Sequence, residues 1–146
     1  FKLYHIITIN DIPAIIDLKK IKLLITNFVF NEGYEVKKID YNFVSKTKIL
    51  KINSKHLNHK SETDILTFDY SESKKIEAEI YLCCSVIKKH AKENNQSVEN
   101  EIVRVMIHGV LHCMGYNDKV DNEKILMTKK EDLFLKMFHV KHYNHV

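Results

Sequence analysis

The sequence has few residues of the kinds that cross-link a chain or break its helices. Its 146 residues include one proline, three glycines and three cysteines, and no tryptophan. The cysteines are Cys83, Cys84 and Cys113, an odd number that argues against a disulfide-built scaffold and is typical of a reducing compartment. We therefore expect a cytoplasmic protein that is held together by its hydrophobic core.

Long hydrophobic runs are also missing. No apolar run approaches the roughly 18 residues of a membrane-spanning helix, so we expect no membrane span and no membrane partner. The first ten residues lack the apolar region of a signal peptide and are expected to form a strand instead. A hydrophobic content of 45% and a charged content of 29% are ordinary for a globular chain. This length and composition predict a single domain over residues 1–146.

Arginine is nearly absent. Of the 23 basic residues, Arg104 is the only arginine, a bias towards lysine that is typical of AT-rich coding. The net charge of +4 permits a polyanionic partner without demonstrating one. The position of the single arginine is therefore more informative than that of any lysine.

The periodicity of apolar residues predicts four strands and five helices. The strands are expected over residues 1–9, 34–44, 64–70 and 76–84, and the helices over residues 13–30, 45–57, 85–94, 98–114 and 122–138. Pro13 is expected to open the first helix and Ser45 to cap the second, and a phase slip at Lys37 and Lys38 indicates a bulge. This order predicts an α+β fold in which a roughly four-stranded mixed sheet packs with helices around a central metal-binding helix.

Two of the three glycines lie in one short window with two histidines. His108 and His112 are four residues apart, which places them one turn apart on the same face of a helix and suits two ligands of one metal ion. Gly115 then offers a helix stop, after which the chain can return Asp118 towards the same ion. The window therefore predicts a metal site made of His108, His112 and Asp118.

The same helix carries a polar stripe on an otherwise apolar surface. Asn100, Arg104, His108 and His112 follow one another at intervals of four residues. Because burying unpaired polar groups is costly, this stripe should face a cleft, a ligand or a metal. The alternative is a pair of core histidines satisfied by backbone carbonyls, or a wetted helix edge. The glycine stop and the trailing Asp118 favour the metal.

This window resembles the signature of the YbeY family of bacterial endoribonucleases and rRNA maturation factors. The family signature contains the same two histidines, followed by the glycine and the tyrosine that are Gly115 and Tyr116 here. The resemblance extends over about residues 50–135. Three further segments carry it: Ile52-Asn53, which resembles the family's Leu-Asn; Thr63 to Phe68, which resembles its Thr-Asp-Val-Leu-Ser-Phe strand; and Glu123, Met127 and Glu131, which match the spacing of its last helix.

The resemblance implies a function and a set of partners. It implies one zinc ion held by three side chains, in a cytoplasmic endoribonuclease directed at single-stranded RNA. Such a protein would process the 3′ end of small-subunit ribosomal RNA and take part in ribosome quality control. The implied partners are ribosomal RNA and the small ribosomal subunit, a small-subunit ribosomal protein and an Era-type GTPase.

The chain departs from the family pattern in three places. Asp118 stands where the family commonly has a histidine, and aspartate is an ordinary zinc ligand whose charge should make the ion a weaker Lewis acid. Leu57 stands at a family arginine associated with catalysis or phosphate binding, and leucine can serve neither role. Residues 78–80 read Ala-Glu-Ile instead of Gly-Asp-Ile. Arg104, one turn before His108, is a candidate phosphate contact in place of the missing arginine, with a salt bridge to a neighbouring carboxylate as the alternative.

Two other functions compete with the nuclease. A zinc protease would use a helix with the same two histidines, but Gly109 stands where that motif has its glutamate base. A ribosome-assembly factor with a structural zinc is made plausible by Leu57. A closed structural site needs four protein ligands, and Cys113 lies about 100° around the helix from His112, where it suits a small apolar role. An open site, with water as the fourth ligand, is therefore expected.

Overall fold

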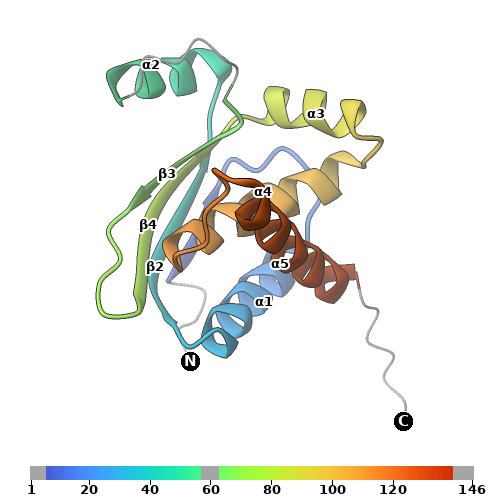
Figure 1. Ribbon diagram of the computed structural model, residues 1–146. Coiled ribbons are helices and arrows are strands. Elements are labelled where there is room, and N and C mark those ends of the chain that lie inside the picture. The colour runs from blue at the N-terminus through green and yellow to red at the C-terminus, as the bar shows by residue number, and fades with distance from the viewer. Residues whose placement is uncertain (1–5, 57–62, 140–146) are drawn as a thin grey trace.

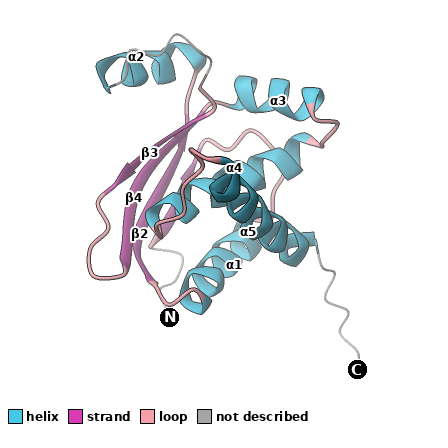
Figure 2. Ribbon diagram, viewed as in Figure 1, coloured by secondary structure: helices cyan, strands magenta, loops and turns pink. Residues whose placement is uncertain are grey.

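The computed structural model describes residues 6–56 and 63–139 as a mixed sheet packed with helices (Figures 1 and 2). The strands are β1 (Ile7–Asn10), β2 (Glu35–Phe43), β3 (Ile65–Asp69) and β4 (Lys75–Leu82). The helices are α1 (Leu18–Asn31), α2 (Lys46–His56), α3 (Cys84–Glu93), α4 (Val98–Cys113) and α5 (Asp121–His139). The predicted α+β fold is confirmed. Within the described residues, no helix combines the length and the apolar character needed to cross a membrane.

The four strands form one sheet in the order β1-β2-β4-β3. β1, β2 and β4 are parallel, and β3 pairs with β4 in the antiparallel sense, so the predicted mixed sheet is confirmed. On β4 the alternating apolar residues are all buried: Ile76, Ala78, Ile80 and Leu82. The register between β2 and β4 shifts between Val36 and Lys38, which confirms the bulge that the phase slip predicted.

Helices α1, α4 and α5 lie on one side of this sheet (Figure 1). α4 contacts β3 and β4 on one side and α3 and α5 on others, which confirms its central position. Its apolar residues are almost all buried, as a helix that is apolar nearly all round should be. The phenol of Tyr41 on β2 donates a hydrogen bond of 2.9 Å to the carbonyl of Met106, which fixes the helix to the sheet.

The first helix begins later than the position of Pro13 predicts. α1 starts at Leu18, and the carboxylate of Asp17 accepts a hydrogen bond of 3.0 Å from the amide of Lys20. Asp17 is the stronger start signal because its side chain satisfies an amide that the first turn leaves unpaired. The cap of α2 is as expected, with Ser45 Oγ accepting from the amide of Lys48 at 3.1 Å. Leu57 lies outside the described residues, as do the first five residues of the predicted N-terminal strand.

Candidate metal centre

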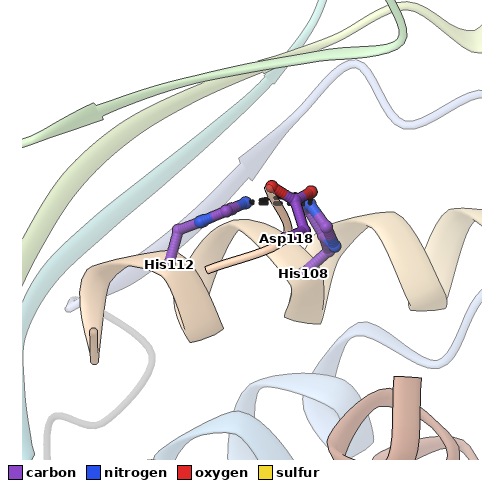
Figure 3. Close-up of side chains that lie close together, drawn as sticks. All are labelled: His108, His112 and Asp118. Carbon is purple, nitrogen blue, oxygen red and sulfur yellow. Dashed lines mark hydrogen bonds and ion pairs between the residues drawn. The ribbon is translucent and has the colours of Figure 1, made fainter. Parts of the chain in front are cut away.

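The two histidines project from the same face of α4 near its C-terminal end (Figure 3). Their rings stand edge to face with centroids 4.6 Å apart, and their Nε2 atoms lie 3.0 Å from one another. This is the one-turn spacing that residues four apart on a helix must have. The sequence prediction that His108 and His112 meet is therefore confirmed.

The helix ends in a turn that brings Asp118 back over the histidines. Gly115 has a φ of +92°, a backbone conformation that side chains disfavour, and its amide bonds to the carbonyl of His112 at 3.0 Å. The turn is anchored by Tyr116, whose hydroxyl donates to the carboxylate of Glu32, and by Lys130, which pairs with the same carboxylate at 2.8 Å. This anchored turn fixes the approach of Asp118.

Three donor atoms converge at this point: Nε2 of His108, Nε2 of His112 and Oδ2 of Asp118. The carboxylate oxygen lies 3.3 Å from the first nitrogen and 3.6 Å from the second, and all three atoms lie within 4.8 Å of one another. Zinc bonds of about 2.0–2.1 Å in a tetrahedron place neighbouring ligands about 3.3 Å apart. The donor types and their separations therefore fit a metal ion held by these three residues.

A buried carboxylate on α5 completes the surroundings of His108. Oε2 of Glu131 lies 2.6 Å from Nδ1 of His108, and the side chain of Glu131 is 9% exposed. With Nδ1 donating to this carboxylate, neutral His108 keeps the lone pair of Nε2 free for a metal. Glu131 thus selects the tautomer that a ligand needs.

The two histidines have pKa values that move in opposite directions. Burial lowers the pKa of His108, but the hydrogen bond and charge of Glu131, together with the charge of Asp118, outweigh burial and raise it. Burial and the neighbouring His108 lower the pKa of His112. In the metal-free protein a proton therefore binds to His108 before His112.

Arg104 is committed to carboxylates in this structure. Its guanidinium donates to Oε1 of Glu131 at 2.8 Å and to Oδ1 of Asp132 at 2.7 Å. The ion-pair alternative considered for this residue is thus the arrangement observed, and a phosphate contact stays a prediction. At the far end of the stripe, Asn100 pairs with His139 at 2.7 Å. The polar stripe therefore faces α5 as well as the metal centre.

Gly109 points away from the centre and towards the sheet. A Cβ atom at this position would lie 3.0 Å from Oγ1 of Thr67, 3.1 Å from Cδ1 of Ile65 and 3.2 Å from Cδ1 of Ile80. The missing side chain lets α4 pack closely against β3 and β4. A glutamate here, as in the zinc protease motif, would have to enter this tight contact. This packing counts against the protease alternative.

A small cavity of about 140 Å³ adjoins the centre on the N-terminal side of His108. Its polar lining includes Glu101, Arg104 and Glu131, together with Asp64, which immediately precedes β3. Asp64 pairs with Nδ1 of His90 on α3 at 3.2 Å. The cavity therefore has both charged and apolar walls, and it borders the candidate metal ligand His108.

Sequence reasoning found the three candidate ligands but assigned no role to Glu131 or Glu101. Glu131 lies on the apolar face of α5, where its neighbours Met127, Phe134 and Leu135 are buried. A single carboxylate among the apolar positions of a helix face is the same signal that identified the polar stripe on α4. The sequence alone could therefore have indicated a role for this residue. Glu101 gives no comparable signal, because it stands in the acidic first turn of a helix, where carboxylates are common.

Comparisons with known proteins agree with this architecture. A family model described as Endoribonuclease YbeY matches residues 10–139. Endoribonuclease YbeY of Flavobacterium psychrophilum is 40% identical over 117 residues, which cover 80% of this chain and 84% of the relative. The protein of the same name from Chlorobium chlorochromatii is 38% identical, with 88% and 82% covered. A solution structure of a Thermotoga maritima protein superposes with a TM-score of 0.65 at 27% identity, covering 90% of this chain and 88% of that one.

Proposed function

This chain belongs to the endoribonuclease YbeY family, and we propose that it is a metal-dependent endoribonuclease that cleaves single-stranded RNA during ribosomal RNA maturation. The observation that carries the proposal is the convergence of His108, His112 and Asp118 at ligand spacing. His108 and His112 stand in the signature by which the chain resembles the family, and Asp118 stands where the family commonly has a histidine. The relatives bear the name of an RNA-cleaving enzyme, and the proposal extends that activity to this chain.

Zinc is the metal that we propose for this centre. Two imidazoles and one carboxylate form a donor set typical of catalytic zinc, in which three protein ligands leave a position open. The three side chains are 23%, 33% and 42% exposed, so the centre is accessible from solvent. When bound, zinc would lower the pKa of a water ligand from about 15.7 towards about 7 and would stabilise charge on a phosphoryl oxygen.

The protein's own groups have distinct roles in this proposal. Glu131 holds the His108 ring and its tautomer through Nδ1, and Arg104 balances the charge of Glu131 from the opposite side. Asp118 adds one negative charge to the ligand set, which lowers the Lewis acidity of the centre relative to three histidines. Each Nη atom of Arg104 donates one hydrogen bond to a carboxylate, so three of its five N–H groups remain for the proposed phosphate contact.

The cellular setting is part of the proposal. We place the protein in the cytoplasm, as a single domain that processes the 3′ end of small-subunit ribosomal RNA and serves ribosome quality control. The small ribosomal subunit, one of its proteins and an Era-type GTPase are the proposed partners. Leucine at position 57, where the family has an arginine, favours one alternative: a non-catalytic assembly factor with a structural zinc.

The test compares wild type with His112→Ala, both prepared without metal and then supplied with zinc. The substrate is a labelled RNA that spans the 3′ end of small-subunit ribosomal RNA. We expect cleavage by wild type alone and loss of zinc from the variant, with the same folding transition in both. Cleavage by both proteins would place the active centre elsewhere. Cleavage by neither, with zinc retained by wild type, would support the assembly factor.

A further inference from the structure

A cavity of about 460 Å³ lies between the end of α1 and the hairpin that joins β3 to β4, at one end of the sheet (Figure 1). Its lining includes two aromatic residues, Phe30 and Tyr34, and two lysines, Lys74 and Lys75, with Glu35 as the carboxylate. Within residues 6–56 and 63–139, neither lysine forms an ion pair. This cavity is therefore basic and aromatic, whereas the cavity beside the metal centre is rich in carboxylates.

The aromatic wall of this cavity is accessible to a ligand. Phe30 is 72% exposed in the last turn of α1, whereas Phe28, two residues earlier, is buried and packs edge to face on Phe134. A single exposed apolar residue is ordinary on a protein surface. Phe30 is informative because it lines a cavity together with two lysines that have no carboxylate partner. Such a ring offers a planar surface for stacking next to positive charge.

The hairpin turn presents a lysine at a position where the backbone favours other residues. Ser73 and Lys74 form the two-residue turn, with φ values of +52° and +62°. Asparagine and glycine are the residues that usually occupy such turns, because side chains disfavour positive φ. The carbonyl of Lys74 accepts a hydrogen bond of 2.9 Å from the amide of Glu35, and its Nζ lies 5.8 Å from the centroid of the Tyr34 ring. The turn therefore holds Lys74 against the cavity despite its strained backbone.

The cavity is connected to the metal centre through the residues that support its third ligand. The phenol of Tyr34 donates a hydrogen bond of 3.0 Å to the carbonyl of Met114, where the turn that returns Asp118 begins. Glu32, two residues before Tyr34, accepts a hydrogen bond from Tyr116 in the same turn. Surfaces that bind single strands contact several consecutive nucleotides. An RNA strand that passes through the metal centre and over this turn would therefore reach the cavity.

We propose that this cavity binds single-stranded RNA beyond the metal centre, with a base stacked on Phe30 and a phosphate bound by Lys74 and Lys75. The inference rests on the proposed function, because it takes RNA as the substrate. Proteins that bind single strands combine aromatic rings, which stack on bases of any sequence, with cations that follow the backbone. The volume lies within the range of about 300–1,000 Å³ that holds small organic ligands, so a nucleotide fits. A protein segment docked on Phe30 would have to cover both lysines, whereas RNA neutralises them.

Phe30→Trp tests the stacking directly, because the chain has no tryptophan of its own and the variant has a single indole at the cavity. The matched control is Leu23→Trp: Leu23 is 42% exposed on the same face of α1, seven residues earlier, and does not line the cavity. The zinc-loaded variants are mixed rapidly with single-stranded RNA, and fluorescence is read before cleavage. We expect saturable quenching in Phe30→Trp and little change in Leu23→Trp. RNA binding without quenching in Phe30→Trp would overturn the proposal.

Loss of the side chains provides a second measurement. Phe30→Ala should weaken RNA binding by about tenfold, and Lys74→Ala should lower the slope of log affinity against log salt by about one. Lys19→Ala, which removes an exposed lysine of α1 outside the cavity, should leave the slope unchanged. Unchanged RNA affinity in Phe30→Ala, with a protein partner lost instead, would assign the cavity to that partner and contradict the proposal.

The two proposals fail in different ways. If zinc-loaded wild type binds RNA with the predicted dependence on Phe30 and Lys74 but cleaves none, the proposed function fails and the RNA-binding cavity stands. If wild type cleaves RNA and Phe30→Ala cleaves it with the same KM and kcat, the proposed function stands and the cavity has no part in binding the substrate.

Discussion

At the scale of single residues, His108 depends on a partner from another helix. Glu131 approaches its Nδ1 at 2.6 Å, and Arg104 holds the second oxygen of the same carboxylate at 2.8 Å. The three groups form a chain from a cation, through a carboxylate, to a metal ligand. Such partners fix the ring and raise the basicity of the ligand, so their loss weakens the metal site without removing a ligand.

We predict that Glu131→Ala lowers zinc affinity by about 10- to 100-fold, the usual effect of losing a carboxylate that orients a histidine ligand. Competition with a chelator measures this change. Asp132→Asn is the control, because Asp132 also pairs with Arg104 but is 58% exposed and does not contact the histidine. Equal zinc affinities for wild type and Glu131→Ala would show that His108 needs no orienting partner.

The opposite pKa shifts of the histidines predict how metal binding depends on pH. Metal binding requires both rings to be deprotonated, so protons compete with the metal and the affinity falls as the pH falls. Because the pKa of His108 is raised and that of His112 is lowered, His108 takes up the first proton. The pKa of His108 lies above the ordinary histidine value of about 6.5. Just below that pKa, zinc affinity should fall about tenfold for each pH unit, and the fall should become steeper once His112 also protonates.

Chelator competition across pH 5.5 to 8 would measure this profile. In the higher part of this pH range, where only His108 takes up a proton, each zinc ion should displace about one proton. Glu131→Gln provides a matched variant, because it removes the charge that raises the pKa of His108 and should move the fall in affinity to lower pH. A profile that is flat over this range would contradict the assignment of the histidines as ligands.

At the scale of elements, the metal centre depends on how closely α4 approaches the sheet. The helix crosses β3 and β4 at Gly109, and at its end the turn through Gly115 is fixed to α1 and α5 by Tyr116, Glu32 and Lys130. The two glycines therefore have different purposes. Gly109 allows close packing, and Gly115 allows the left-handed turn that returns Asp118.

We predict that Gly109→Glu destabilises the fold by about 3 kcal/mol or more, because it forces a carboxylate and its stem between α4 and the sheet. Gly109→Ala should cost less, since a single methyl group meets mainly side-chain atoms and the helix gains up to about 1 kcal/mol in propensity. Urea unfolding measures both variants. A stable Gly109→Glu variant that hydrolyses peptides would revive the protease alternative.

At the scale of the whole molecule, local patterns predicted the elements well and their assembly less completely. The bulge near Lys37, the cap at Ser45 and the helix stop at Gly115 follow from short-range chemistry, and all three are present. The start of α1 was misplaced because proline is compatible with a helix start without requiring one, whereas Asp17 forms the cap. Periodicity also leaves the strand order open, since it describes which face is buried and not which strands pair.

In the candidate site, too, the residues that lie close together in the sequence were predicted, and those brought in by packing were not. His108, His112 and Asp118 lie within eleven consecutive residues, so helix spacing and one glycine were sufficient to bring them together. Glu131 reaches His108, and Asp64 reaches the adjoining cavity, only through the packing of α5 and β3 against α4. Contacts between residues far apart in the chain have no local signature, which is why the partner of His108 and the adjoining cavity required the structure.

The central claim is that these three side chains hold a metal ion and leave it accessible to water. X-ray absorption at the zinc edge of the loaded wild-type protein tests it most directly. We predict one zinc per chain with two imidazole nitrogens at about 2.0–2.1 Å, the remaining ligands oxygen, and a spectrum that changes in Asp118→Ala. A sulfur ligand at about 2.3 Å, which would bring in Cys113, or an unchanged spectrum in Asp118→Ala, would contradict the account.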